Sequence, residues 1–136
     1  MAITVDDIDW RPEGIIVTVH HSKTNKSGRV ETKSIVRAST SAPYCPVRLL
    51  EMWLLASGIK RGAVFRAVSL ADRIGAGRLS AQVVHLRMQK ALEQAGLSAK
   101  GYSPHSFRAG FITEAHLRGR SDVQIKRVSG HSDQRT

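Results

Sequence analysis

The segment from Ser103 to Thr136 reads SPHSFRAGFITEAHLRGRSDVQIKRVSGHSDQRT, and its first half predicts a helix. Ser103 can cap that helix, and Pro104 suits the first helical position, where a missing N–H costs nothing. Gly119 marks its end. One apolar face is indicated by residues that recur at every fourth position, namely Phe107, Phe111 and Ala115. This helix is the element around which the rest of the chain is interpreted.

A second, shorter helix is predicted directly after the first. Ser121 and Gln124 have the spacing of a capping box, in which each side chain bonds to the backbone of the other residue. Ile125 and Val128 lie three residues apart and are expected to point inward. Gly130 ends this helix, so the residue after it lies in a turn.

Three side chains of this segment suit a phosphate group. His105 and Arg108 are three residues apart, so a helix places them one turn apart on one face, and His131 follows the glycine stop. A guanidinium can hold two oxygens at once and keeps its charge, and an imidazole can donate a hydrogen bond or move a proton near neutral pH. A His-x-x-Arg pair by itself is more often a solvated helix face.

The whole string resembles the C-terminal half of the catalytic domain of tyrosine recombinases, the phage-integrase class of site-specific DNA recombinases. The His-x-x-Arg box of that family is similar to His105–Arg108, and its Gly-His box is similar to Gly130–His131. The resemblance implies an α+β fold that is mainly α, with a small three-stranded antiparallel sheet followed by a helical bundle. Residues 1–136 would form one incomplete catalytic domain of the DNA breaking–rejoining type, with the sheet in 1–38 and the helical part in 46–136.

Composition and charge agree with a DNA-binding protein but do not require one. The 136 residues are 41% apolar, which is ordinary for one globular domain, and the net charge is +10. Such a basic chain favours a polyanionic partner, nucleic acid before an acidic membrane surface. No apolar run is long enough to cross a membrane, and no signal peptide is recognisable. A single cysteine, Cys45, excludes an internal disulfide, so we expect a structural thiol in a reducing cytoplasm, near the bacterial nucleoid.

The first 38 residues predict the antiparallel sheet. A broken strand runs through Ile3, Val5 and Ile8 to Trp10, and further strands cover 15–20 and 30–36. The polar residues 20–28 between the last two strands predict a hairpin tip.

That hairpin tip carries Lys23 and Lys26. Read alone, these lysines are solvated loop charges or phosphate contacts. The resemblance implies a catalytic role for Lys23, since Ser22-Lys23-Thr24 is similar to the lysine motif of the family, with Lys26 as a second choice and a DNA contact.

The central part of the chain predicts two helices and a loop. After a linker at 39–45, Pro46 opens a helix that Gly58 closes, with an apolar side built from Val47, Leu49, Leu50, Trp53 and Leu54. Residues 68–77 read as a loop with two glycines. The arginines in or beside it, Arg66, Arg73 and Arg78, are candidates for contacts to a DNA backbone.

Ser80 caps the next helix, which Gly96 ends. Its buried stripe is predicted to contain Val84, Met88, Ala91, Leu92 and Ala95. The residues off this stripe are His85, Arg87 and Lys90. The resemblance implies that they contact DNA, and a solvated polar face is an equally good interpretation.

The resemblance also implies a mechanism. A tyrosine hydroxyl attacks the scissile phosphate to give a 3′-phosphotyrosine, and the freed 5′-hydroxyl later attacks a partner strand, without a metal or another cofactor. Arg108 would clamp the non-bridging oxygens and His105 would act as base or orient the nucleophile. His131 would donate to a phosphate oxygen and Lys23 would protonate the leaving 5′-oxygen. The parent enzyme would work on double-stranded DNA as a tetramer that holds paired sites.

Two family features are missing from the sequence. An arginine that precedes the first strand in the family has no counterpart, and Tyr44 and Tyr102 both lie upstream of the Gly-His box that the nucleophile normally follows. We therefore expect that this polypeptide alone forms no covalent DNA adduct.

Three other interpretations stay open. The first is a DNA-binding module without catalysis. The second is a metal-independent phosphodiesterase that uses His105, His131 and Lys23 on RNA. The last in rank is a metal site built from the six histidines, whose spacing fits no known ligand motif.

Overall fold

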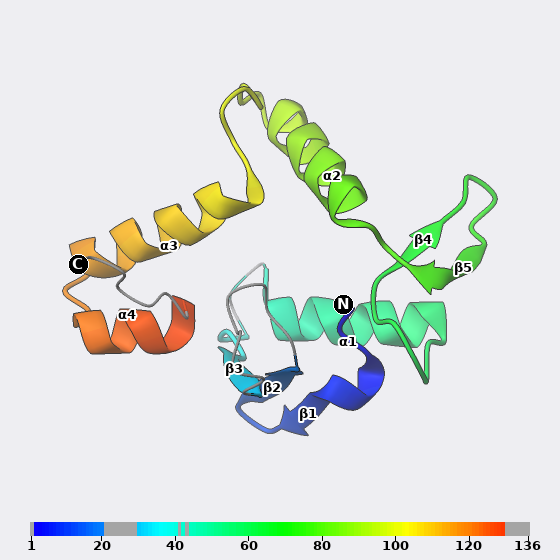
Figure 1. The fold of residues 1–136 in the computed structure, drawn as a ribbon, viewed down its shortest axis with the longest axis horizontal. Helices are drawn as coiled ribbons and strands as arrows, with labels where there is room; N and C mark the ends of the chain where they lie inside the picture. The colour runs from blue at the N-terminus through cyan, green and yellow to red at the C-terminus, as the bar shows by residue number, and fades with distance from the viewer. Residues whose placement is uncertain (1, 21–29, 41, 43, 130–136) are drawn as a thin grey trace. The chain divides into compact units, whose positions relative to one another are not determined.

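The computed structural model describes residues 2–20, 30–40, 42 and 44–129, and divides into two compact units, Met1–Leu79 and Ser80–Thr136. In the described part of the chain the first unit contains a three-stranded sheet, a helix and a small hairpin, and the second contains three helices (Figure 1). The predicted α+β class with a three-stranded antiparallel sheet is confirmed.

The sheet has the strand order β1-β2-β3, with β1 at Ile8–Arg11, β2 at Gly14–Val19 and β3 at Glu31–Val36, all antiparallel. The predicted strand through Ile3 and Val5 is wrong. Thr4 makes an isolated bridge to Ala63, and a 3-10 turn at Val5–Asp7 precedes β1. The turn forms because the Asp7 carboxylate accepts hydrogen bonds from the Thr4 amide at 2.7 Å and the Thr4 hydroxyl at 2.8 Å.

Helix α1, Pro46–Ser57, packs on the inner face of this sheet (Figure 1). It begins with proline and ends at Gly58, whose φ of 63° is left-handed, as predicted. The buried residues between the sheet and the helix are Ile8, Ile15, Val17, Cys45, Val47 and Val64. Trp53 packs beside them and donates from its indole N–H to the Val64 carbonyl at 2.8 Å, which confirms it as a core residue.

The segment that joins β3 to α1 is held by side-chain hydrogen bonds. The Cys45 sulfur is 2% exposed and accepts from the Ala38 amide at 3.3 Å. The Arg48 guanidinium donates to the carbonyls of Ala38, Ser39 and Ala42 at 3.4, 3.2 and 2.8 Å. Cys45 is therefore a structural thiol, as expected.

Beyond α1 the structure differs from the prediction. Residues 68–77 were expected to be a loop, within a part expected to be helical. Instead β4, Arg66–Val68, and β5, Ile74–Arg78, pair as an antiparallel hairpin. Its turn is closed by a bond of 2.9 Å from the Ser69 amide to the Arg73 carbonyl, and Asp72 has a φ of 53°. Aspartate tolerates this conformation better than most residues, but its presence is not a strong sequence signal for a hairpin.

The second unit contains α2 at Ala81–Gln94, α3 at Pro104–Leu117 and α4 at Asp122–Ser129. The predicted helix starts are confirmed: the Ser80 hydroxyl accepts from the Val83 amide at 3.2 Å, and Ser103 caps α3. The predicted burial is largely wrong. No residue of α2 is buried, and Val84 is half exposed. Phe107 and Phe111 of α3 are exposed, as is Val128 of α4, whereas Ala115 and Ile125 are buried as expected. Periodicity therefore found the apolar face of each helix but could not say whether another element covers it.

An ion pair connects the 3-10 turn to the end of β2. His20 directly follows β2, and its Nε2 lies 2.9 Å from Oδ1 of the buried Asp7. The amide and hydroxyl of Thr4, followed by His20, lower the pKa of the Asp7 carboxyl. The contact fixes the point at which the chain leaves the sheet.

The turn between β1 and β2 brings the backbone of Gly14 against β3. A Cβ atom at residue 14 would lie 2.1 Å from the Ile35 carbonyl oxygen and 3.0 Å from the Val36 Cα. Both contacts are with backbone, which cannot rotate away as a side chain would. We expect Gly14→Ala to lower the free energy of unfolding by about 1–3 kcal/mol, as overpacked sites do. Urea unfolding followed by circular dichroism measures this.

Gly77 provides the matched control. It also lies in a strand, but a Cβ there has nothing within 4 Å. We expect Gly77→Ala to change the urea midpoint little. Equal effects of the two substitutions would contradict the close approach of β2 and β3 at Gly14.

The Asp7 carboxylate predicts an acid-sensitive fold. Because its pKa is lowered in the folded state, its contribution is present above the unfolded value, near 3.8, and is lost as the pH falls through the folded value. Asp7→Asn should therefore destabilise the chain at pH 7 and flatten the dependence of stability on pH below about 4. Asp9→Asn is the control, because Asp9 is exposed and pairs only with the neighbouring Arg11 side chain at 2.5 Å. If Asp7→Asn leaves the pH dependence of the free energy of unfolding below about 4 unchanged, the Asp7 carboxylate does not cause the acid sensitivity.

Candidate functional site

Helix α3 carries two of the four predicted catalytic residues. Its start is fixed because the Ser103 amide donates to the Ser106 hydroxyl at 3.0 Å, in a reciprocal capping arrangement. His105 and Arg108 follow within the first two turns, and both side chains are exposed. The first turn contains no acidic residue, so the positive end of the helix is not neutralised there. This end of α3 is therefore favourable for an anion.

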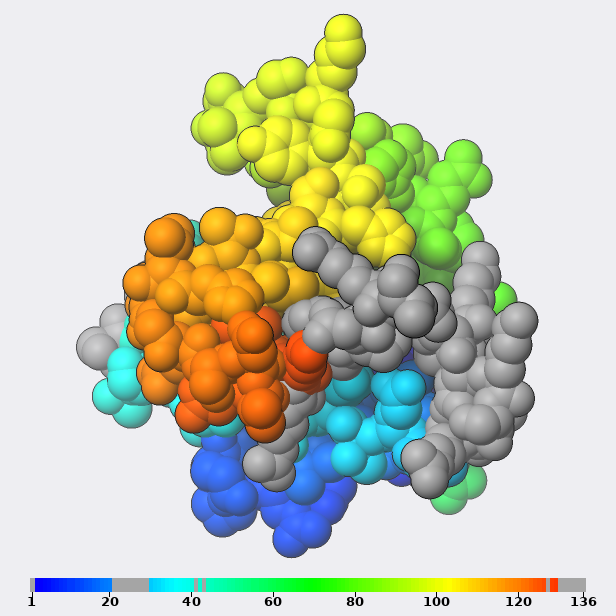
Figure 2. Space-filling view, turned by 60° about the vertical axis from the view of Figure 1, so that its left-hand side comes forward, coloured from blue at the N-terminus to red at the C-terminus, as the bar shows by residue number. Residues whose placement is uncertain are grey.

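Helix α4 packs against α3 (Figures 1 and 2). Ile125, 2% exposed, anchors it, and its start is capped by two bonds between Ser121 and Gln124, at 3.2 and 3.4 Å. His116 of α3 lies 3.6 Å from Asp122 of α4. The capping box predicted from the sequence is thus confirmed, and it sets the direction in which α4 runs.

Arg108 connects the two helices at the other end of α4. Its Nη2 group donates a hydrogen bond to the carbonyl oxygen of Ser129, the last residue of α4. Residue 129 directly precedes the Gly130–His131 pair in sequence. The guanidinium of the His-x-x-Arg box therefore lies at the last described residue before the Gly-His box in sequence.

The other predicted catalytic residues lie outside the described residues: these are His131, Lys23 and also the alternative Lys26. Within the described part of the chain His105 has no hydrogen-bond partner. The convergence of the four groups around one phosphate stays a prediction, with the two members of α3 positioned on one helix.

Most of the predicted DNA contacts are exposed, and one has a structural role instead. Arg87 and Lys90 are exposed on α2 and three residues apart, so they share a helix face, whereas the half-buried His85 lies on another side. Arg78 is exposed at the end of β5. Arg66 instead has a structural role, since its guanidinium donates to the Ala63 carbonyl at 2.9 Å and to the Arg61 carbonyl.

Sequence reasoning missed the contact between Asp7 and His20. The two residues are thirteen positions apart, and only the pairing of β1 with β2 brings them together. No local pattern in the sequence indicates that Asp7 has a histidine partner.

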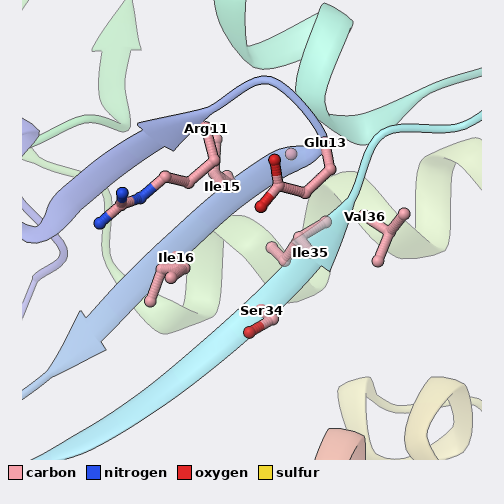
Figure 3. Close-up of a pocket in the computed structure, with 8 residues that line it drawn as sticks. Arg11, Glu13, Ile15, Ile16, Ser34, Ile35 and Val36 are labelled. Carbon is pink, nitrogen blue, oxygen red and sulfur yellow. The ribbon is translucent and has the colours of Figure 1, made fainter.

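A shallow hollow of about 120 Å³ lies on the sheet beside the turn between β1 and β2 (Figure 3). The labelled residues that line it include Arg11 and Glu13 at the turn and Ser34 and Val36 of β3. None of the predicted site residues contributes to it.

No group of three or more His, Cys, Asp or Glu side chains among the described residues could hold a metal ion. No helix in that part of the chain is long and apolar enough to cross a membrane.

Comparison with known proteins identifies the family. The sequence profile described as "Phage integrase family" matches residues 1–136. The chain is 32% identical over 133 residues to "Integrase/recombinase xerD homolog" of Selenomonas ruminantium, an alignment that covers 98% of this chain and 39% of that protein. The chain thus spans about two fifths of the length of this curated relative. No solved structure matches it. Because the profile covers every residue and this relative is aligned over nearly the whole chain, the chain belongs to the phage integrase family of tyrosine recombinases.

Proposed function

We propose that this chain supplies the phosphate-binding part of a site that breaks and rejoins duplex DNA in site-specific recombination. The observation that carries the proposal is the contact between Arg108 and the Ser129 carbonyl, because Ser129 directly precedes the Gly-His box in sequence. The net charge of +10 agrees with a polyanionic substrate.

In the proposed reaction each residue acts on a different part of the phosphodiester. Arg108 holds the non-bridging oxygens, where charge develops in the transition state. His105 orients or deprotonates the attacking tyrosine hydroxyl, and His131 donates to a phosphate oxygen. Lys23 gives its proton to the 5′-oxygen that leaves. The tyrosine oxygen gains a bond to phosphorus as the 5′-oxygen loses one, so the phosphotyrosine conserves the bond energy and no cofactor is consumed.

The proposal extends to the assembly and the place of action. The recombinase would act as a tetramer that holds two DNA sites, on DNA of the bacterial nucleoid or of a mobile element. Arg78, Lys26 and the face of α2 with Arg87 and Lys90 would contact DNA backbone, and His85 would make a separate contact from another side of α2.

If Arg108 clamps a phosphate, its charge and its two-point hydrogen-bonding geometry should contribute separately to DNA binding. Arg108→Ala should weaken binding to labelled duplex DNA and lower the slope of log K against log salt by about 1, since one phosphate contact is lost. Arg108→Lys should keep the slope but still bind more weakly, because an ammonium cannot form the two-point fork. Fluorescence anisotropy across a salt series measures both quantities.

Arg118→Ala is the control, since Arg118 directly follows α3 and is already paired with Glu114 at 2.6 Å. It should change affinity and slope less than Arg108→Ala does. If all three variants bind as the original chain does, Arg108 is not a phosphate ligand.

The α2 contacts predict a larger electrostatic effect. The double variant Arg87→Ala/Lys90→Ala should lower the salt slope by about 2, one unit for each phosphate contact. The exchange variant Arg87→Lys/Lys90→Arg keeps both charges and should retain the original slope. A double alanine variant with an unchanged slope would assign this face of α2 to solvent.

A further inference from the structure

The Arg108 guanidinium uses only part of its donor capacity within the protein. An arginine head group has five N–H donors, arranged so that it presents two separate two-point forks. Among the described residues its one partner is the Ser129 carbonyl, reached from Nη2. An Nη2 group carries two hydrogens, one in each fork. The contact with Ser129 therefore occupies one fork and leaves the other complete.

The acceptor is a carbonyl at a helix C-terminus. The last four carbonyls of a helix have no partner within it, and they form the negative end of its dipole. Ser129 is the last residue of α4, so its carbonyl lies at the negative end of this helix. A guanidinium suits it in charge as well as in hydrogen bonding.

The carbonyl is held in place from several sides. Ile125 is 2% exposed against α3, and the Ser129 hydroxyl donates to the Ile125 carbonyl at 2.8 Å, which closes the last turn. The Ser121–Gln124 cap secures the first turn. An eight-residue helix is too short to be stable alone, so these contacts determine where its end lies.

We propose that α4 is the positioning element of Arg108: the Ser129 carbonyl fixes the guanidinium so that its unused fork is presented to a DNA phosphodiester. Ile125 and Gln124 then act as positioning residues, without touching the phosphate. The inference rests on the proposed function for the identity of the ligand, whereas the contact itself is independent of it. An arginine held in advance loses less freedom on binding than one that must be ordered by its ligand.

The contact is tested first in the free chain, by nitrogen NMR of the arginine side chains. A guanidinium bonded to a carbonyl rotates slowly about its Cζ–Nη bonds, so Arg108 should give resolved Nη signals. Ile125→Ala should average these signals. Gln124→Ala removes only the cap and should average them partly, so it replaces Ile125→Ala if that larger change unfolds the unit. Arg118 is the internal control, because its partner Glu114 lies on α3 itself. Resolved Arg108 signals that persist when α4 is frayed would overturn the proposal.

A double-mutant cycle in DNA binding then tests whether α4 acts through Arg108. Ile125→Ala is expected to weaken binding to labelled duplex DNA about fivefold, the value of one lost hydrogen bond. In the Arg108→Ala background the same change should have no further effect, because its target is gone. Gln124→Ala should follow the same pattern at smaller size. Additive losses would show that α4 supports the fold in general and would overturn the proposal.

The two measurements separate the two ideas. If Arg108 is fixed by α4 but no variant alters DNA binding, the proposed function fails. The inference then fails too, because the positioned Arg108 has no DNA ligand. If Arg108→Ala weakens binding while Ile125→Ala and Gln124→Ala do not, the inference fails and the proposed function stands.

Discussion

Burial of β-branched side chains between the sheet and α1 is the constraint on which the first unit depends. Ile15 and Val17 of β2 point to the helix and meet Val47, so a shift of one residue in pairing would turn both outward. The register is therefore fixed, with Val19 opposite Glu31 as the last pair of β2 with β3. The Asp7–His20 contact adds a second tie at the same end. The residues that flank the segment 21–29 in sequence are thus held at defined positions.

The helical unit is held differently. Ala115 and Ile125 are its buried apolar residues among those described, and several large apolar side chains of α3 and α4 are exposed. The arrangement of α3 and α4 therefore depends more on polar contacts than on a packed core. These contacts are the capping bonds, the His116–Asp122 pair and the Arg108–Ser129 hydrogen bond. Interactions of this kind are weaker and depend more on charge than apolar packing. The positions of α3 and α4 at the candidate site are consequently set by polar groups that are also exposed to solvent.

The elements recognised from sequence are those with local signals. Pro46 and Gly58 delimit α1, and the serines at 80, 103 and 121 mark helix starts, because capping depends on residues within one turn. Long-range features were missed. The β4–β5 hairpin has two glycines in a five-residue strand and no β-branched alternation, and the Asp7–His20 pair needs the sheet to exist first. For the site, spacing placed His105 and Arg108 on one helix, but no pattern could indicate that the carbonyl of Ser129 is the partner of Arg108.

The two units share an excess of basic residues. Residues 1–79 contain 12 Lys and Arg against 7 Asp and Glu, and residues 80–136 contain 9 against 4, so both units are basic. Like charge on two linked units opposes their association, and a polyanion bound to each relieves that repulsion. A phosphodiester backbone does this at every residue that meets it, in contrast to a small anion, which neutralises one site. The same reasoning explains why Arg108 can keep a carbonyl as its internal partner. A carbonyl orients the guanidinium without cancelling its charge, whereas a carboxylate in that position would have neutralised it.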